Sequence, residues 1–284
     1  MTTAVLAFDA GPGAGMGHQR RMEVLARCLA AKGTETALIA AEERAKADVV
    51  VVDSYRFRAD DSEHFEGNVL VALDDLRRDL AVDVVVDPSP GAYADPHTAA
   101  AHVLAGPTYA LIDPALASSP VAPVGAEVKS VLVATGAGDD GGTGARLAAV
   151  LAKALPQATV RLAVGPWATA TAPAGVDALE TTEGLGRALA EADLVVTAGG
   201  VTMLEALALG RPTVAVVLAE NQRQAVEGAA AAGAVAFAET GTAARVAVEL
   251  AGAPSSRQAL SNAARCLIDG RGAERVAERV LSLV

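Results

Sequence analysis

The chain of 284 residues is long enough for two domains of ordinary size; 52 % of its residues are apolar and only 3 % are aromatic. Its formal net charge is −11, and the sequence contains no block of basic residues. Because polyanion binding depends on clustered Lys and Arg, this charge argues against nucleic acid and anionic membranes as partners. Any phosphate bound by this chain must be held mainly by backbone amides and helix N-termini.

The cysteines and the N-terminus indicate an intracellular location. Cys28 and Cys266 lie far apart, without metal-ligand or C-x-x-C spacing, so two buried thiols are expected. The segment Met1–Phe8 has no basic region and leads directly to Asp9, unlike a signal peptide. No apolar run reaches membrane-spanning length. We therefore expect a cytoplasmic protein with no cofactor, no metal and no membrane insertion, and the sequence leaves its oligomeric state open.

Short apolar runs alternate with longer Ala- and Leu-rich segments. Runs that are apolar throughout are typical of strands covered on both faces, and strand–helix alternation indicates parallel sheets. The first helix is predicted by Met22, Leu25, Ala26 and Leu29 at i, i+3, i+4 and i+7, with Gly33 at its C-terminal cap. The predicted strands are Ala4–Phe8, Val49–Val52, Val69–Leu73, Val84–Val86, His102–Ala105, Val131–Ala134, Val160–Val164, Leu194–Thr197, Thr213–Val217 and Val235–Phe237.

A probable domain boundary follows from composition. The segment Ser118–Gly125 (SSPVAPVG) has the composition of a linker. It separates two halves of similar length, and each half opens with a strand and a Gly-rich turn. We expect an α/β protein of two Rossmann-like domains, residues 1–122 and 123–284. From Ser256 onward the sequence predicts one or two amphipathic helices, and the last of them is a candidate to pack back across the first domain.

The first candidate site is the turn after the first predicted strand, from Asp9 to Arg21 (DAGPGAGMGHQRR). Open parallel sheets bind ligands beyond the carboxyl ends of their strands, where this turn lies. Its glycines, Gly15 and Gly17 among them, are by themselves a weak dinucleotide signal. The helix dipole disfavours the cationic form of His18 by typically ~0.3–1 kcal/mol, which leaves a neutral imidazole able to accept a proton. A His that only packs at a turn is the alternative.

The second candidate site is the turn TAGGVTMLE after the strand Leu194–Thr197. Gly199 and Gly200 leave backbone N–H groups free to bind an anion, and Thr202 adds a hydroxyl. One turn into the following helix, on the same face as Val201, Glu205 can accept hydrogen bonds from a ribose diol. A glutamate that only favours the helix dipole is the alternative.

Further polar turns follow other strands. Gly136 and Gly138 permit close approach of a ligand, whereas Asp139–Asp140 would repel phosphate and are expected to point away or cap a helix. The amides of Asn221 and Gln222 can reach sugar hydroxyls, with a plain polar turn as the alternative.

Acidic residues close two strands of the first half, at Asp53–Tyr55 and at Asp74–Asp75, on the same sheet edge as His18. Adjacent carboxylates can raise one another's pKa, although such pairs also occur in solvated turns.

Six motifs together resemble one family. In this order they resemble the hydrolase of pseudaminic acid synthesis, which cleaves UDP-2,4-diacetamido-2,4,6-trideoxy-β-L-altropyranose. That family has the GT-B architecture and is similar to the glycosyltransferase that makes lipid II. The motifs are Gly15–Arg21 (G-x-G-H-x-x-R), Asp53–Tyr55 (D-x-Y), Leu73–Leu76 (D-D), Gly106–Leu111 (G-x-x-Y-A-L), Ala198–Glu205 (A-G-G-x-T-x-x-E) and Asn221–Gln222 (N-Q).

The resemblance implies two parallel sheets facing across a cleft that binds a nucleotide-sugar, in cell-surface polysaccharide synthesis. It implies that the C-terminal half holds UDP, with Glu205 on the ribose, and that His18 is the general base for water attack with inversion. The expected nucleotide-binding set is Gly136, Gly138, Gly199, Gly200, Val201, Thr202 and Glu205. The expected substrate-binding set is Asp9, Gly15, Gly17, Arg21, Tyr55, Asp75, Tyr109, Asn221 and Gln222.

The sequence also departs from the family pattern. Phe8 stands where the family usually has Arg before its first Asp, Asp87–Pro88 replaces the usual Asn, and Asp113 replaces the usual Arg. A Gly-Gly pair becomes Gly136-Ala137-Gly138. These departures concentrate in the sugar half and leave the identity of the sugar open.

Three functions therefore stand as expectations. The first is a metal-independent UDP-sugar hydrolase that releases UDP and a free amino- or deoxy-sugar. The alternative is a GT-B glycosyltransferase with a UDP-sugar donor and a soluble acceptor. The second alternative is a non-catalytic sugar-nucleotide binding protein, which would tolerate loss of His18.

Overall fold

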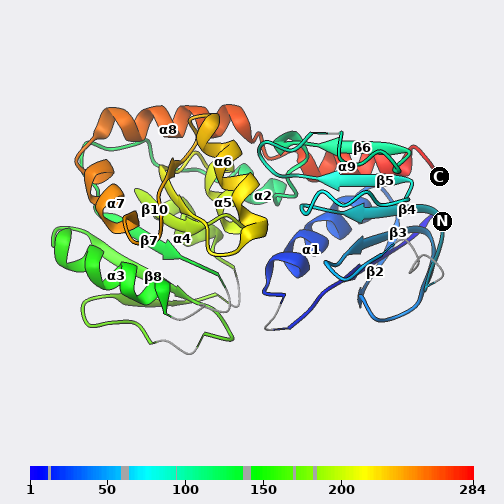
Figure 1. The fold of residues 1–284 in the computed structure, drawn as a ribbon, viewed down its shortest axis with the longest axis horizontal. Coiled ribbons are helices and arrows are strands. Elements are labelled where there is room, and N and C mark those ends of the chain that lie inside the picture. Colours follow the sequence, from blue (N-terminus) through cyan, green and yellow to red (C-terminus); the bar gives the residue numbers. More distant parts are fainter. Residues whose placement is uncertain (12–13, 59–63, 94, 137–141, 169–170, 182–183) are drawn as a thin grey trace. The chain divides into compact units, whose positions relative to one another are not determined.

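The computed structural model describes residues 1–11, 14–58, 64–93, 95–136, 142–168, 171–181 and 184–284. The chain divides into two compact units (Figure 1), one formed by Met1–Pro114 with Gly270–Val284 and the other by Ala115–Asp269. The composition of the sequence placed this boundary near residue 122, with 123–284 as the second domain and the last helix as a candidate to pack back across the first. In the structure the division falls at Pro114, before the linker-like segment, and the last helix belongs to the first unit.

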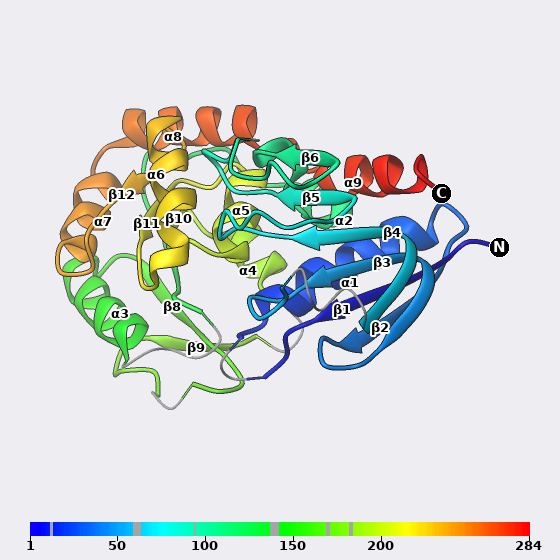
Figure 2. The same cartoon turned by 45° about the vertical axis from the view of Figure 1, so that its right-hand side comes forward.

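The N-terminal unit is built on a six-stranded sheet of order β2-β1-β3-β4-β5-β6, in which every neighbouring pair is parallel (Figure 2). Its central strands are runs of valine that are buried on both faces, as in Val49–Val52 and Val84–Val86. The strands are β1 (Thr3–Phe8), β2 (Glu35–Ala40), β3 (Ala45–Asp53), β4 (Phe65–Leu73), β5 (Val84–Asp87) and β6 (His102–Ala105).

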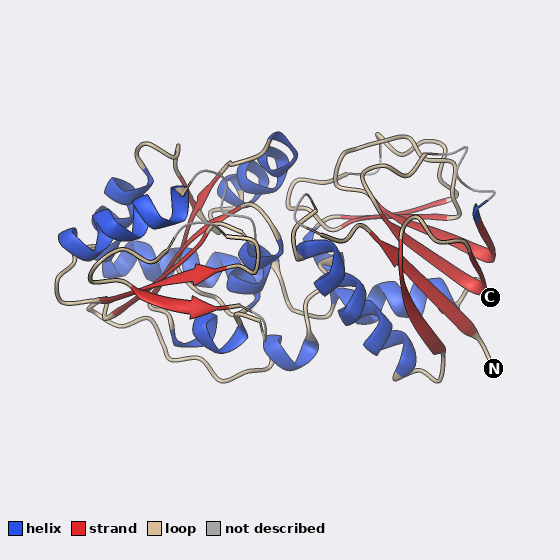
Figure 3. Ribbon diagram, turned by 90° about the horizontal axis from the view of Figure 1, so that it is seen from below, coloured by secondary structure: helices blue, strands red, loops and turns tan. Residues whose placement is uncertain are grey.

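Helices cover one face of this sheet, and loops cover the other (Figure 3). Helix α1 (Gly17–Ala30) and helix α9 (Gly272–Leu281) pack against each other, and α9 also contacts the short 3₁₀ helix η2 (Pro107–Tyr109). The apolar stripe of α1 shares one core with Val276 and Val280 of α9. On the opposite face the core is completed by loop residues, which include Phe57, Leu80 and Val82.

The C-terminal unit contains a second six-stranded parallel sheet, of order β12-β11-β10-β7-β8-β9. The short strands β7, β10 and β11 form the buried centre of this sheet. The strands are β7 (Ser130–Ala134), β8 (Thr159–Val164), β9 (Asp177–Glu180), β10 (Leu194–Ala198), β11 (Thr213–Val216) and β12 (Ala236–Phe237).

Helices pack on both faces of this second sheet. Residues of α3 and α7 share one core with the sheet, and residues of α4 and α5 share the other. Helix α8 contacts α5 and α7. The helices are α2 (Pro114–Ala117), α3 (Thr143–Ala154), α4 (Gly186–Glu191), α5 (Val201–Ala208), η3 (Glu220–Gln222), α6 (Arg223–Ala231), α7 (Ala243–Ala251) and α8 (Pro254–Leu267).

The expected architecture of two Rossmann-like α/β units is confirmed, and all ten predicted strands are present. Eight lie within one residue of their expected bounds, whereas β3 and β4 each begin four residues earlier than predicted. The sequence did not predict β2 and β9, which lie at sheet edges and are largely exposed, so neither needs a continuous apolar run. The expectation of two buried thiols was wrong for Cys266, which is exposed, while Cys28 is buried. No helix among the described residues is both long and apolar enough to cross a membrane.

Candidate functional site

Acidic side chains gather at the carboxyl edge of the N-terminal sheet. The strands β1, β3, β4 and β5 are consecutive in the sheet, and the chain places Asp9, Asp53, Asp74 and Asp87 at or just after their ends. In the register of the first pair, Phe8 lies opposite Asp53. Because neighbouring parallel strands end at the same edge, carboxylates that are far apart in sequence meet there.

Asp53 is the centre of this edge, and it is fully buried. Its Oδ1 lies 2.6 Å from Nδ1 of His18 in the first turn of α1. Arg21, one turn further along α1, donates two hydrogen bonds to the same carboxylate, from Nε to Oδ2 and from Nη2 to Oδ1, both at 2.5 Å. The i, i+3 spacing of His18 and Arg21 puts both side chains on one face of the helix, where a single carboxylate serves both.

The charge on Asp53 fixes the tautomer of His18. Burial alone would raise the pKa of Asp53, but the Arg21 guanidinium and the hydrogen bonds from His18 and Arg21 hold that pKa below its ordinary value. An ionised carboxylate only accepts hydrogen bonds, so Nδ1 of His18 carries the proton and donates it. Nε2 is then the basic nitrogen of the neutral ring. This is the arrangement that a general base needs.

Tyr55 and Asp75 stand next to His18. The rings of Tyr55 and His18 meet edge to face, with centroids 4.7 Å apart. The Tyr55 hydroxyl lies 3.5 Å from Asp75 Oδ2, which also accepts a 3.1 Å bond from Nη1 of Arg21. The other oxygen of this carboxylate, Oδ1, is a buried acceptor with no hydrogen-bond partner among the described residues. His18, Arg21, Tyr55 and Asp75, which the sequence placed in one site, are thus brought together.

Asp9 serves the backbone of the neighbouring turn. Its Oδ1 accepts from Oγ of Ser54 at 2.9 Å and from Nη2 of Arg56 at 2.9 Å, and its Oδ2 accepts from the Tyr55 amide at 3.1 Å. Both oxygens of Asp9 are therefore occupied by contacts that hold the turn of Tyr55, although the sequence predicted that Asp9 binds substrate.

The other predicted residues of this unit have structural positions. Gly15 adopts φ +73° in the turn before α1, a conformation that favours glycine, and Gly17 is the first residue of that helix. Tyr109 ends η2 and packs against the main core of the unit. A Cβ on Gly272 would collide with the backbone of Tyr109 and Ala110, so α9 packs tightly on that segment.

Asp87 is fully buried beside this cluster. Its Oδ1 accepts from the Ser89 amide at 3.1 Å. Burial raises the pKa of Asp87 and the nearby Asp75 charge adds to that shift, while the hydrogen bonds from Ser89 oppose it. Folding therefore stabilises the protonated form of Asp87 relative to its ionised form.

We expect Asp87→Asn to raise stability at neutral pH. A folded-state pKa above the unfolded value means that stability is lost as pH rises from about 4, the ordinary carboxyl value, through the folded pKa. The neutral amide avoids that loss. Urea unfolding of both proteins at pH 7 and pH 3 tests this, since the gain should vanish at pH 3, where both side chains are neutral. A loss of stability at pH 7 would contradict it.

The predicted nucleotide-binding residues lie at the carboxyl edge of the C-terminal sheet. Gly199 and Gly200 form the turn between β10 and α5, and Val201, Thr202 and Glu205 lie in the first two turns of that helix, all partly buried. Gly136 is the second residue after β7, a sheet neighbour of β10, and adopts φ +121°. Gly138 lies outside the described residues.

The two glycines of the β10–α5 turn differ in what surrounds them. A Cβ on Gly199 would overlap Val226 of α6 and come within 3.0 Å of Gln222, whereas a Cβ on Gly200 would have nothing within 4 Å. Gly199 is therefore required for packing, and Gly200 is the position that is open to a ligand.

Asn221 and Gln222 form part of η3, which lies in the connection between β11 and α6. Oε1 of Gln222 accepts from the amides of Leu218 and Ala219, at 3.0 and 3.4 Å. The side-chain oxygen of Gln222 is therefore occupied within its own turn. A sugar hydroxyl that bound here would accept a hydrogen bond from the side-chain nitrogen, Nε2.

The fold can be compared with solved structures. MurG of Acinetobacter baumannii is 15 % identical, over 99 % of this chain and 100 % of that chain, with a TM-score of 0.59. The calicheamicin glycosyltransferase CalG4 is 16 % identical, over 100 % and 98 %, with a TM-score of 0.64. S. aureus MnaA, solved with UDP, is 11 % identical, over 100 % and 98 %, with a TM-score of 0.63. This chain has the GT-B fold.

Sequence comparison does not place the chain more finely within the GT-B fold. No family model matches it, and no curated protein matches it. Its residues must therefore carry the argument about function.

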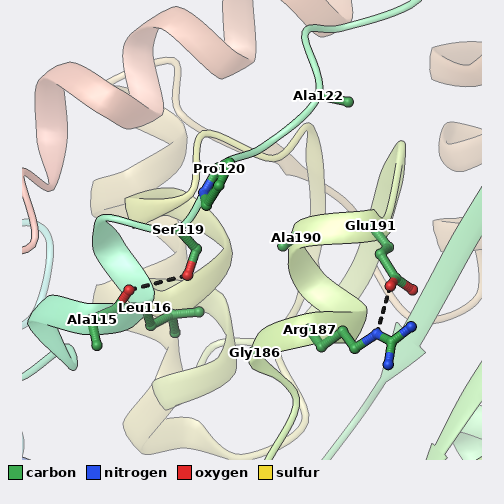
Figure 4. A pocket seen from close by; sticks show the side chains of 9 residues that line it. All are labelled: Ala115, Leu116, Ser119, Pro120, Ala122, Gly186, Arg187, Ala190 and Glu191. Atoms are coloured by element: carbon green, nitrogen blue, oxygen red, sulfur yellow. Dashed lines mark hydrogen bonds and ion pairs between the residues drawn. The ribbon is translucent and has the colours of Figure 1, made fainter.

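One pocket lies away from the predicted residues (Figure 4). It has a volume of about 640 Å³ and is lined by α2, the segment that follows it, and α4. Its polar groups include an ion pair between Arg187 and Glu191 at 2.8 Å, which is a common surface pair one helical turn apart. Within the described ranges no group of three or more His, Cys, Asp and Glu side chains could hold a metal ion.

Two features of this candidate site were missed in the sequence. Asp53 was noted as part of the D-x-Y motif but was not assigned to His18, and Arg78, which contacts the same loop as Asp9, was not singled out. The available signal for Asp53 was its place directly after a buried strand, on the same edge as the end of β1.

Proposed function

We propose that this protein is a sugar-nucleotide enzyme that hydrolyses a UDP-sugar, with His18 as the general base. The observation that carries the proposal is the 2.6 Å contact between His18 Nδ1 and Asp53 Oδ1, which leaves Nε2 to accept a proton. A base held in a fixed tautomer at the carboxyl edge of a parallel sheet suits activation of a water molecule. The GT-B neighbours, which include a glycosyltransferase and a protein solved with UDP, are consistent with it.

The chemistry follows from the roles of these side chains. Nε2 of His18 removes a proton from water as its oxygen attacks the anomeric carbon, and the C–O bond to UDP breaks with its electron pair leaving on the diphosphate. Attack opposite the leaving group inverts the anomeric centre. Asp53 stabilises the imidazolium that forms, and Arg21 keeps Asp53 ionised.

The residues of the C-terminal unit are proposed to hold UDP. Gly200, Thr202 and Gly136 would receive the diphosphate through backbone N–H groups and a hydroxyl, and Glu205 would bind the ribose diol. On the sugar side, Asp75 Oδ1 is a buried acceptor that lacks a partner in the described part of the chain, so a sugar hydroxyl or amino group is the donor that would satisfy it.

A glycosyltransferase is the second candidate, and the same observation supports it. A base that activates water also activates an acceptor hydroxyl, and the GT-B neighbours include the calicheamicin glycosyltransferase. A protein that only binds sugar nucleotides would have no use for the buried Asp53–His18 pair.

UDP release from a panel of UDP-sugars, without and then with soluble acceptors, tests the proposal. Release without an acceptor, with an inverted free sugar as the product, is the expected result. Release that occurs only when an acceptor is added would replace hydrolysis by transfer. UDP binding without release under either condition would leave the binding protein as the function.

The two glycines of the β10–α5 turn offer a matched pair for the UDP site. We expect Gly200→Ala to change stability by less than about 0.5 kcal/mol, because its Cβ meets open space at φ −106°, and to weaken UDP binding. Gly199→Ala should destabilise the unit by about 1–3 kcal/mol through overpacking against Val226. Thermal unfolding and UDP calorimetry measure both effects. Unchanged UDP affinity in Gly200→Ala would remove this turn from the nucleotide site.

A further inference from the structure

One arginine holds the backbone segment that carries Tyr55. Arg78 lies in the connection that follows β4, and its side chain is 17 % exposed. Its Nε donates to Asp74 Oδ1 at 2.6 Å. Its Nη1 and Nη2 donate to the carbonyls of Tyr55 (3.1 Å), Phe57 (2.8 Å) and Ser54 (3.1 Å). One guanidinium thus joins the end of β4 to the turn that follows β3.

The turn that contains Arg78 is itself conformationally unusual. Arg77 has φ +57°, and it is the non-glycine residue with positive φ among those the structure describes. Side chains rarely adopt this conformation unless the surroundings enforce it, and such residues cluster at functional sites. Asp74 enforces it here, because its Oδ2 accepts from the Arg78 amide at 2.6 Å and its Oδ1 from the Leu76 amide at 3.4 Å.

A buried histidine contacts the backbone carbonyl of Arg78. The His97 side chain is completely buried, and its Nδ1 lies 3.0 Å from the Arg78 carbonyl. Since a carbonyl only accepts, Nδ1 of His97 is the donor. The connection between β5 and β6 therefore holds the connection between β4 and β5, and both the backbone and the side chain of Arg78 are immobilised.

We propose that Arg78 is a positioning residue for the His18 site, which holds Tyr55 against His18 and beside Asp75 by tying the Ser54–Phe57 backbone to Asp74. Tyr55 also contacts this site through its amide, which donates to Asp9 Oδ2 at 3.1 Å, and through its ring, whose centroid lies 4.7 Å from that of His18. The planar fork of an arginine can satisfy these acceptors together, which the single ammonium of a lysine cannot do. The inference rests on the proposed role of His18 as the base.

The test compares Arg78→Met and Arg78→Lys with two matched controls in the full chain. Arg58→Met removes an exposed arginine whose Nη1 donates to the same carbonyls of Tyr55 and Phe57, at 2.9 and 3.0 Å, but is not among the partners of Asp74. Arg257→Met removes a buried arginine of the C-terminal unit that also donates to four backbone carbonyls, and so controls for lost stability alone.

Two readouts separate positioning from stability. The first is turnover, where Arg78→Met should lower kcat by about 10–100-fold, as expected for a displaced catalytic geometry, with UDP affinity within about three-fold of wild type. The second is the NMR signal of the His18 ring, assigned by its loss in His18→Gln. Removal of Arg78 should change the Tyr55 ring-current shift of this signal, Arg78→Lys should restore part of it, and neither control should move it.

The outcomes are distinct. An unchanged His18 signal in Arg78→Met, with stability lowered as in Arg257→Met, would overturn the positioning role. If Arg78→Met does not fold, Arg78→Lys carries the same test, because it keeps the charge and loses the fork. If wild type shows no turnover but the His18 signal moves in the Arg78 variants alone, the proposed function fails and the positioning of His18 stands.

Discussion

His18→Gln is expected to lower kcat for UDP-sugar turnover by about 10²–10⁴-fold, the usual contribution of a positioned general base. The glutamine amide is polar and of similar length, but it has no basic lone pair to take the place of Nε2. UDP affinity should stay within about three-fold of wild type, because the proposed UDP contacts lie in the other unit. Steady-state kinetics and calorimetry with UDP measure the two quantities.

His102→Gln is the matched control. His102 is a partly exposed histidine on β6 whose Nδ1 lies 3.0 Å from Arg279 Nη2, outside the cluster around Asp53. This variant should retain wild-type kcat. Equal loss of activity in both variants, or full activity in His18→Gln, would remove His18 as the base.

Asp53→Asn should reduce both activity and stability. The asparagine amide has one accepting oxygen where the carboxylate has two, so the tautomer of His18 is no longer fixed. The buried guanidinium of Arg21 also loses the negative charge of Asp53, to which it donates two hydrogen bonds. Removing one partner of a buried pair typically costs about 3–5 kcal/mol. We expect kcat to fall by at least about 10²-fold, within the range of an impaired general base. Urea unfolding and steady-state kinetics measure the two losses.

The stability loss should depend on pH with a definite sign. The pKa of Asp53 is lowered in the folded state, so its stabilisation is present above the unfolded carboxyl value of about 4 and is lost as pH falls through the folded pKa. The difference between wild type and Asp53→Asn should therefore be constant at neutral pH and shrink below about pH 4. A difference that persists unchanged at low pH would contradict the ionised pair.

Asp79→Asn provides the comparison for this pH dependence. Asp79 is an exposed residue of the same unit, and its pKa is also lowered, by hydrogen bonds from the Ala99 amide and the Thr98 hydroxyl at 2.6 and 2.8 Å. Its replacement should change acid stability slightly and leave kcat unchanged. A kcat effect as large as that of Asp53→Asn would mean that general loosening of the unit explains both.

Local patterns in the sequence were sufficient for most of the fold. Runs such as Val49–Val52 can only be buried between two covered faces, and the apolar stripe of α1 can only face a sheet, so strands, helices and parallel pairing follow from composition and periodicity. The edge strands β2 and β9 were missed for the same reason, because exposure removes the signal that burial imposes.

Part of the candidate site was also readable. His18 and Arg21 stand on one helical face, and Tyr55 and Asp75 follow strands that end at one sheet edge, so their association follows from period and topology. The packing roles of Tyr109 and Gly199 were not readable, because each depends on a neighbour that the sequence does not bring near: the main core of the unit for Tyr109 and the start of α6 for Gly199.

The α/β class, the positions of the central strands along the chain and the turns in which polar residues collect all follow from local sequence patterns. Which of those residues are partners depends on how the strands and helices pack in three dimensions. Because β3 pairs with β1 so that Phe8 lies opposite Asp53, the Asp53 carboxylate reaches His18, which stands 35 residues earlier in the chain. The partners of Arg78 lie up to 24 residues away and are mostly backbone carbonyls, which every residue carries and no sequence pattern marks.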